Sequence, residues 1–166
     1  MAGIFPAVSA NAAAALLAAC ARRGLRLATA ESCTGGLIAG CLTEIAGSSS
    51  VLERGYVVYG NRAKVEMLGV REATLAAHGA VSEPTAREMV AGAIARSGCQ
   101  LAVAVTGIAG PGGGTAEKPV GLVHLAAGRH GGPVLHRRAV FGGDRSTVRL
   151  ATVTAALVLA RGVVPP

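Results

Sequence analysis

A short segment at residues 29–40, with the sequence TAESCTGGLIAG, places a nucleophilic side chain at a predicted junction between a strand and a helix. Ser32 follows an apolar run, so its hydroxyl would face the unpaired N–H groups of the first helical turn. Those donors, with the positive end of the helix, could hold a developing oxyanion. Gly35 and Gly36 would leave room for a substrate carbonyl. A plain helix N-cap is the competing interpretation of Ser32, because serine is favoured there.

A serine nucleophile needs a base, and the segment YVVYGNRAKVEML supplies Tyr59 and Lys64. Lowering the pKa of a lysine from about 10.4 to near 7 takes roughly 4 kcal/mol, which burial among apolar groups and other cations can supply. The competing interpretation is a solvent-facing helical lysine. Cys33 is a rival nucleophile, since a helix N-terminus would lower the pKa of its thiol, whereas an ordinary buried thiol is inert.

A glycine-rich segment at residues 105–121, VTGIAGPGGGTAEKPVG, follows an apolar run that predicts a central buried strand. Glycine-rich loops can present backbone N–H groups to phosphates, although a flexible connection is the competing interpretation. The segment is neither a Walker A motif nor GxGxxG. Thr106 stands at the strand end, a common place for ligand contacts in open α/β sheets. Arg145, at a predicted helix start, suits a phosphate.

Strands and helices alternate along the chain around these segments. We expect helices at residues 10–23, 34–46, 61–69, 71–79, 82–98 and 144–162. We expect strands at 25–30 and 100–107, a strand or hairpin at 51–60, and a two-stranded ribbon at 120–128 and 134–142. This order predicts the α/β class, with a mixed sheet in a three-layer domain.

The composition narrows the classes of protein. The 166 residues are 51% hydrophobic and 15% charged, which excludes a disordered chain. A net charge of +7 favours an anionic partner, but two Tyr, two Phe and no Trp offer few stacking platforms and argue against nucleic acid as that partner. Four cysteines without a CxxC pair, and four scattered histidines, predict a reduced cytoplasmic domain without a metal site. No secretory signal or membrane span is expected.

Seven ordered motifs connect these segments: AESCTGG, AGSSS, YVVYGNRAK, GAVSEP, TGIAGPGGG, KPVG and FGGDR. Together they closely resemble the CinA C-terminal domain family, over about residues 10–161. The resemblance implies an α/β/α sandwich that hydrolyses nicotinamide mononucleotide to nicotinate mononucleotide and ammonia, with no metal or organic cofactor. It also implies a homodimer and a single domain over residues 1–166, like the stand-alone members that lack a molybdopterin-binding-like domain.

By position, the resemblance implies that Ser32 is the nucleophile and that Tyr59 and Lys64 activate it. The expected mechanism has neutral Lys64 taking the serine proton, directly or through Tyr59, while N–H groups around residues 34–36 hold the oxyanion. The residues expected to bind the substrate are Thr34, Gly35, Gly36, Ser48, Asn61, Thr106, Gly107, Gly110 and Arg145.

Two other functions stay open at this point. The first is a non-catalytic nucleotide-binding or regulatory module, linked to competence or DNA damage, in which Ser32 is only a helix cap. It predicts ligand-dependent stabilisation without ammonia release. The second is a nucleic-acid accessory protein, suggested by the charge of +7, which predicts DNA binding that weakens steeply with salt.

Overall fold

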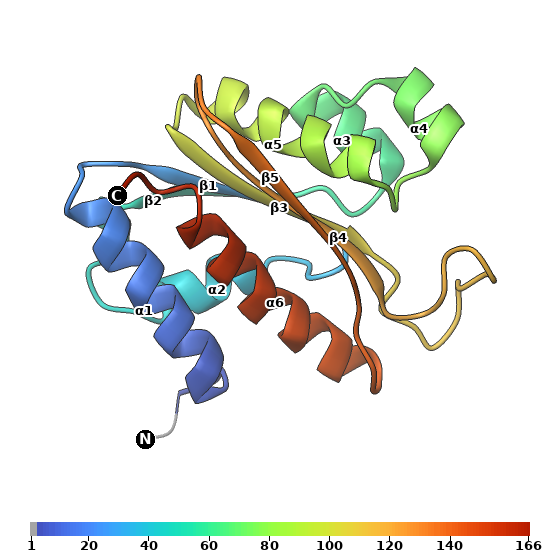
Figure 1. The fold of residues 1–166 in the computed structure, drawn as a ribbon, viewed down its shortest axis with the longest axis horizontal. Helices are drawn as coiled ribbons and strands as arrows, with labels where there is room; N and C mark the ends of the chain where they lie inside the picture. The colour runs from blue at the N-terminus through green and yellow to red at the C-terminus, as the bar shows by residue number, and fades with distance from the viewer. Residues whose placement is uncertain (1–2) are drawn as a thin grey trace.

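A computed structural model describes residues 3–166, and in this part of the chain a five-stranded sheet lies between two layers of helices (Figure 1). The strand order is β2-β1-β3-β4-β5. Their bounds are β1 (Leu27–Glu31), β2 (Leu52–Val57), β3 (Leu101–Gly107), β4 (Leu122–Arg129) and β5 (Val134–Val140). β1 pairs in parallel with β2 and β3, whereas β3–β4 and β4–β5 are antiparallel. The predicted mixed sheet and α/β class are therefore confirmed. Residues 1 and 2 of the expected domain lie outside the described residues.

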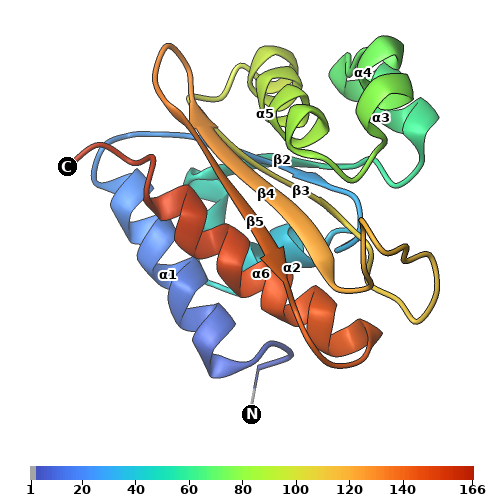
Figure 2. The same cartoon turned by 45° about the vertical axis from the view of Figure 1, so that its right-hand side comes forward.

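The helices divide between the two faces of the sheet (Figure 2). One face carries α1 (Ala7–Ala21), α2 (Leu37–Thr43) and α6 (Arg145–Arg161). The other carries α3 (Asn61–Leu68), α4 (Glu72–His78) and α5 (Glu83–Ser97). A short 3-10 turn, η1 (Ser48–Ser50), precedes β2. This arrangement confirms the expected three layers.

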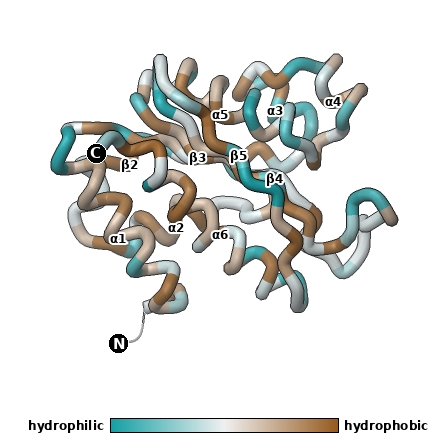
Figure 3. Tube along the Cα trace, in the orientation of Figure 1, coloured by the Kyte–Doolittle hydropathy of each residue, from teal (hydrophilic) through white to brown (hydrophobic). Residues whose placement is uncertain are grey.

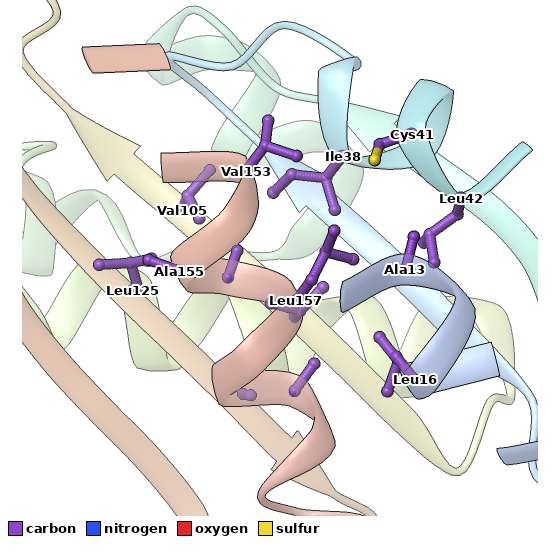
Figure 4. Close-up of a cluster of buried hydrophobic side chains, with 14 of the residues drawn as sticks. Ala13, Leu16, Ile38, Cys41, Leu42, Val105, Leu125, Val153, Ala155 and Leu157 are labelled. Atoms are coloured by element: carbon purple, nitrogen blue, oxygen red, sulfur yellow. The ribbon is translucent and has the colours of Figure 1, made fainter. Parts of the chain in front are cut away.

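Each face of the sheet buries its own apolar core, because successive side chains of a strand point to opposite faces. Leu27, Val103 and Leu125 pack against α1, α2 and α6, in the core that Figure 4 shows around Leu157. The alternate strand positions, such as Ala102, pack against α5 on the other face. Figure 3 shows the hydrophobic segments along the sheet and α2, whereas hydrophilic positions are frequent in α3.

Most observed element boundaries lie within three residues of the predicted ones. Two segments near the site illustrate this. The helix expected at 34–46 begins only at Leu37, because Gly35 and Gly36 have φ values of +59° and +101° that are incompatible with a right-handed helix. Residues 52–57 form one edge strand, which is the first of the two alternatives predicted for 51–60.

A close helix contact holds α3 against the sheet. Gly92 lies in α5 where that helix meets the end of α3, and a Cβ atom there would overlap the carbonyl oxygen of Leu68. The glycine therefore lets the two helices approach backbone to backbone. Because of this close approach, Lys64, one turn before Leu68 in α3, lies near the carboxyl end of β1.

Candidate active site

Ser32 lies one residue beyond β1, at the carboxyl ends of the parallel strands. Its N–H donates to the carbonyl of Val105 in β3 at 3.1 Å, which ties the turn to the sheet. The residue is 8% exposed, so its hydroxyl is close to the surface but mostly enclosed. Ser32 is not the N-cap of α2, because Gly36 occupies that position. The competing helix-cap interpretation of the serine is therefore wrong.

The cap is provided by Glu31, which the sequence analysis did not single out. Its fully buried carboxylate accepts hydrogen bonds from the N–H groups of Gly36, Ile38 and Ala39 at 2.9–3.1 Å. It also accepts one from Thr34 Oγ1 at 2.6 Å. Helix N-termini stabilise negative charge, so an acidic residue just before a strand-to-helix turn was the available signal.

This cap changes the expected oxyanion donors. The N–H of Gly36 is bonded to Glu31, and that of Gly35 donates to the carbonyl of Ser32 at 3.0 Å. Neither group is free for a substrate, so the prediction of donors across residues 34–36 is wrong for these two. The N–H of Thr34 forms no hydrogen bond with any residue in the range 3–166.

Lys64 contacts the serine directly from α3. Its side chain is 1% exposed, and Nζ lies 3.1 Å from Ser32 Oγ, 3.0 Å from the carbonyl oxygen of Val58 and 3.1 Å from that of Tyr59. The two carbonyl oxygens can only accept, so they take two N–H groups of the amine. The third tetrahedral position of Nζ faces the serine. In a neutral amine the lone pair occupies that third position and therefore faces Ser32 Oγ.

The surroundings of Lys64 favour this neutral form. Burial lowers the pKa of Lys64, because the ammonium loses its hydration. Its three hydrogen-bonding partners are neutral oxygens, and no ion pair of Lys64 occurs among residues 3–166. A buried amine without a carboxylate partner, pointing at a hydroxyl, is the geometry of a serine activated by a lysine base. The alternative of a solvent-facing lysine is wrong.

Cys33 does not have the properties of a rival nucleophile. Its thiol is buried, and burial raises its pKa to about 11. A helix N-terminus would have lowered this pKa, but the N-terminal charge of α2 is already taken by Glu31. The thiol is therefore protonated and unreactive at neutral pH.

The Tyr59 side chain points away from the serine and lysine. It is largely exposed, and its hydroxyl accepts a hydrogen bond from Arg145 Nη2 at 3.0 Å. Only the backbone carbonyl of Tyr59 contacts Lys64. A proton relay through the phenol therefore has no geometric support, and the direct contact between Lys64 and Ser32 makes one unnecessary.

Arg145 connects this tyrosine with the glycine-rich loop. Its Nη1 donates to the carbonyl of Gly110 at 2.8 Å. Both of its partners are uncharged, and Arg145 forms no ion pair within residues 3–166. A guanidinium with no carboxylate partner, near Tyr59 and the loop, is available to an anionic ligand.

Thr106 and Gly107 lie beside the serine, in positions that build the site. The parallel register pairs Glu31 with Val105, so Ser32, one residue past the end of β1, is the neighbour of Thr106 on β3. Thr106 is buried and donates from Oγ1 to the carbonyl of Ala80 at 2.8 Å. A side chain at Gly107 would crowd the carbonyl of Leu122. Their binding of substrate stays a prediction.

Ser48 and Asn61 do not belong to this cluster. Ser48 precedes β2 at the amino ends of the parallel strands, whereas Ser32 follows β1 at their carboxyl ends. The length of β1, at about 3.3 Å per residue, separates these two ends by about 16 Å. The prediction that Ser48 lies in the site is therefore wrong. Asn61 is exposed and lines a cavity of about 660 Å³ between α3 and α4, together with Val65 and Glu72. Lys64 does not line that cavity, because its side chain faces the sheet.

Two further results concern cofactors and membranes. Within residues 3–166, no group of three or more His, Cys, Asp or Glu side chains is arranged to hold a metal ion. The helices of the same range are too short or too polar to cross a bilayer.

Comparison with known proteins identifies the family of the chain. The family model described as CinA C-terminal domain matches residues 9–164. The chain is 53% identical over 135 residues to the nicotinamide-nucleotide amidohydrolase PncC of Escherichia coli K12, covering 81% of this chain and 82% of the relative. It is 52% identical to a CinA-like protein of Chloroherpeton thalassium, but spans only 34% of that protein.

Solved structures share the fold. The competence/damage inducible protein CihA of Agrobacterium tumefaciens superimposes with a TM-score of 0.92 at 56% identity, covering 95% of both chains. Competence damage-inducible protein A of Klebsiella pneumoniae gives 0.89 at 39% identity, covering 93% of this chain and 95% of that one. With the family model matching nearly its whole length, the chain belongs to the CinA C-terminal domain family.

Proposed function

We propose that this protein is a nicotinamide-nucleotide amidohydrolase, which converts nicotinamide mononucleotide to nicotinate mononucleotide and ammonia with Ser32 as nucleophile. The observation that carries the proposal is the buried amine of Lys64, 3.1 Å from Ser32 Oγ and held by two carbonyl oxygens. The activity for which the E. coli relative is named, at 53% identity, supports the choice of substrate. Residues 9–164 would act as one catalytic domain.

The chemistry follows from the position of the lysine lone pair. Neutral Lys64 takes the proton of Ser32 as Oγ attacks the carboxamide carbon. The resulting oxyanion is stabilised by the backbone N–H of Thr34, which has no acceptor within residues 3–166. Lys64 then gives its proton to the departing nitrogen, and ammonia leaves. Water attacks the acyl-enzyme, Lys64 takes its proton, and Ser32 regains a proton as nicotinate mononucleotide is released.

Arg145 binds the phosphate of the nucleotide in this proposal. This arginine stands between Tyr59 and the carbonyl of Gly110, with two neutral hydrogen-bonding partners. A phosphate would replace these partners with a charge-assisted pair, which is the stronger interaction. The glycine-rich loop beside it would contribute backbone N–H groups.

The proposal includes a homodimer in the cytoplasm, as the resemblance to the family implies. Sedimentation velocity on the purified chain would give the mass of the particle. A monomer over the working concentration range would contradict the dimer, without affecting the proposed chemistry.

The decisive experiment measures ammonia release from nicotinamide mononucleotide by the wild type and by Ser32→Ala, with calorimetric titration of the same ligand. Release by the wild type that is lost in a folded, ligand-binding Ser32→Ala variant is the expected result. If the folded wild type binds the ligand but releases no ammonia, the chain is instead the non-catalytic nucleotide-binding module. Undiminished release by Ser32→Ala would keep the reaction and refute the nucleophile.

A further inference from the structure

Arg149, on α6, holds the turn that carries the serine. Its Nε donates to the carbonyl of Cys33 and its Nη2 to the carbonyl of Thr34, both at 3.1 Å. The arginine is partly buried, four residues after Arg145 on the same helix face. The planar fork of a guanidinium can bond two neighbouring carbonyls at once, which a lysine ammonium does with less geometric definition.

These two bonds set the direction of a peptide N–H group. In a trans peptide the N–H of Thr34 points opposite to the carbonyl of Cys33, so fixing that carbonyl on α6 turns the N–H away from α6. α6 and α3 lie on opposite faces of the sheet (Figure 1). Lys64 belongs to α3, so it reaches Ser32 from the face opposite α6. The N–H of Thr34 is therefore directed toward the side of the sheet where the serine meets its base.

Thr34 is held at its other end as well. Its hydroxyl donates to Glu31 at 2.6 Å, and the residue is fully buried. Its N–H nevertheless has no acceptor within residues 3–166, whereas the following two N–H groups are already bonded. A rigid, unpaired backbone donor near a nucleophile is what an oxyanion requires, because its alignment costs nothing at the moment of reaction.

Gly35 gives the turn the backbone conformation in which the arginine contacts it. Its φ of +59° is in the left-handed region that favours glycine, and a Cβ atom there would make only an ordinary contact, 3.6 Å from Arg149 Nη2. The turn is thus shaped so that a guanidinium can lie against two consecutive carbonyls. The positive charge behind the peptide also polarises it, which makes the N–H on the far side a stronger donor.

We propose that Arg149 is a positioning residue for the amidase reaction, which orients the N–H of Thr34 as the donor to the oxyanion. This inference rests on the proposed function. Arg149 itself would not touch the substrate, so its contribution appears in the transition state and not in the binding of the nucleotide. It differs in this from Arg145, which we expect to contact the phosphate.

The test compares Arg149→Ala and Arg149→Lys with the wild type and with Arg161→Ala, an exposed arginine at the end of the same helix. We expect kcat to fall about 100-fold in Arg149→Ala, the lower end of the effect of losing one oxyanion donor. KM should change less than threefold. The pH dependence of kcat should keep its midpoint, because Lys64 is untouched. Guanidinium ion at millimolar concentration should restore part of kcat in Arg149→Ala, and Arg161→Ala should behave as the wild type.

Each other outcome has a definite meaning. An active wild type with an unchanged kcat in Arg149→Ala would overturn this inference and leave the proposed function standing. A rise of KM that accounts for the whole loss of kcat/KM would also overturn it, because it would mean that Arg149 contacts the substrate. A loss of kcat that guanidinium does not reverse, together with a lower thermal midpoint, would overturn it as well, because it would mean misfolding. A wild type that releases no ammonia would overturn both the proposed function and this inference.

Discussion

Replacing Lys64 with methionine tests the central contact of the site. Methionine keeps most of the side-chain volume but removes the amine that lies 3.1 Å from Ser32 Oγ. The proton acceptor is lost, so we expect kcat to fall by about 10²- to 10⁴-fold, the usual contribution of a general base. In the wild type, kcat/KM should rise tenfold per pH unit below the pKa of Lys64 and then level off, because only the neutral amine is active.

The same substitution has a signature in stability. Because burial lowers the pKa of Lys64, the unfolded chain binds more protons than the folded one between the folded pKa and about 10.5. In that window the free energy of unfolding of the wild type therefore rises with pH, by up to about 1.4 kcal/mol per unit. Below the folded pKa both states carry the proton, and the lysine contributes no slope.

The assay is urea unfolding of the wild type and Lys64→Met at matched pH values from 6 to 10.5. Cys20 and Cys41 have pKa values raised to about 11 and lower stability as the pH rises, and they do so in both proteins. Cys33 also has a pKa raised to about 11, but its thiol interacts with the Lys64 charge, so both proteins are compared in a Cys33→Ala background. The difference between the two proteins isolates the lysine and should grow with pH. A difference that stays flat would refute a neutral Lys64, and with it the lysine base.

Four further predictions follow from other contacts. Glu31→Gln should lower the free energy of unfolding by about 2–4 kcal/mol in urea denaturation, because it places an NH2 group against backbone donors. Gly92→Ala should cost about 1–3 kcal/mol and lower kcat together with the thermal midpoint, because its methyl group pushes α3 and Lys64 outward; wild-type values would contradict the close packing. Burial, with His136 adjacent, lowers the pKa of His124 to about 4, so the unfolded chain binds more protons between pH 4 and 6.5. His124→Gln should thus lose less stability than the wild type on acidification through that range. Arg145→Ala should raise KM for nicotinamide mononucleotide at least tenfold with little change in kcat, and an unchanged KM would place the phosphate elsewhere.

The oxyanion donors show where reasoning from the sequence stopped. Ser32 and the two glycines after it indicated a turn that opens a helix, and the turn is present. The pattern did not reveal that Glu31 would take the helix N–H groups, because each of those bonds depends on φ values above zero at Gly35 and Gly36. Two possible conformations of one short segment lead to different donors, and only the folded backbone distinguishes them.

Ser48 shows a second kind of limit. Its serine-rich motif belongs to the family pattern, and distance along the chain says nothing about which end of a strand a residue occupies. The parallel pairing of β1 with β2 places residues before a strand and residues after its neighbour at opposite edges of the sheet. Arg149 is the converse case, since an arginine 116 residues away from Cys33 reaches the serine turn by the packing of α6.

The sequence by itself determined the alternation of strands and helices and the mixed sheet. Local periodicity and glycine positions carry that information, because each depends on residues close together in the chain. The pairing of a turn serine with a helical lysine was implied by the resemblance of the ordered motifs to the family. Only the tertiary structure decided that Lys64 is buried with its amine on Ser32, that Glu31 caps α2 and that Arg149 holds the turn. Burial and directed hydrogen bonds arise when distant elements pack together. Neither the shift of a side-chain pKa nor the direction of a backbone donor is fixed before that contact is made.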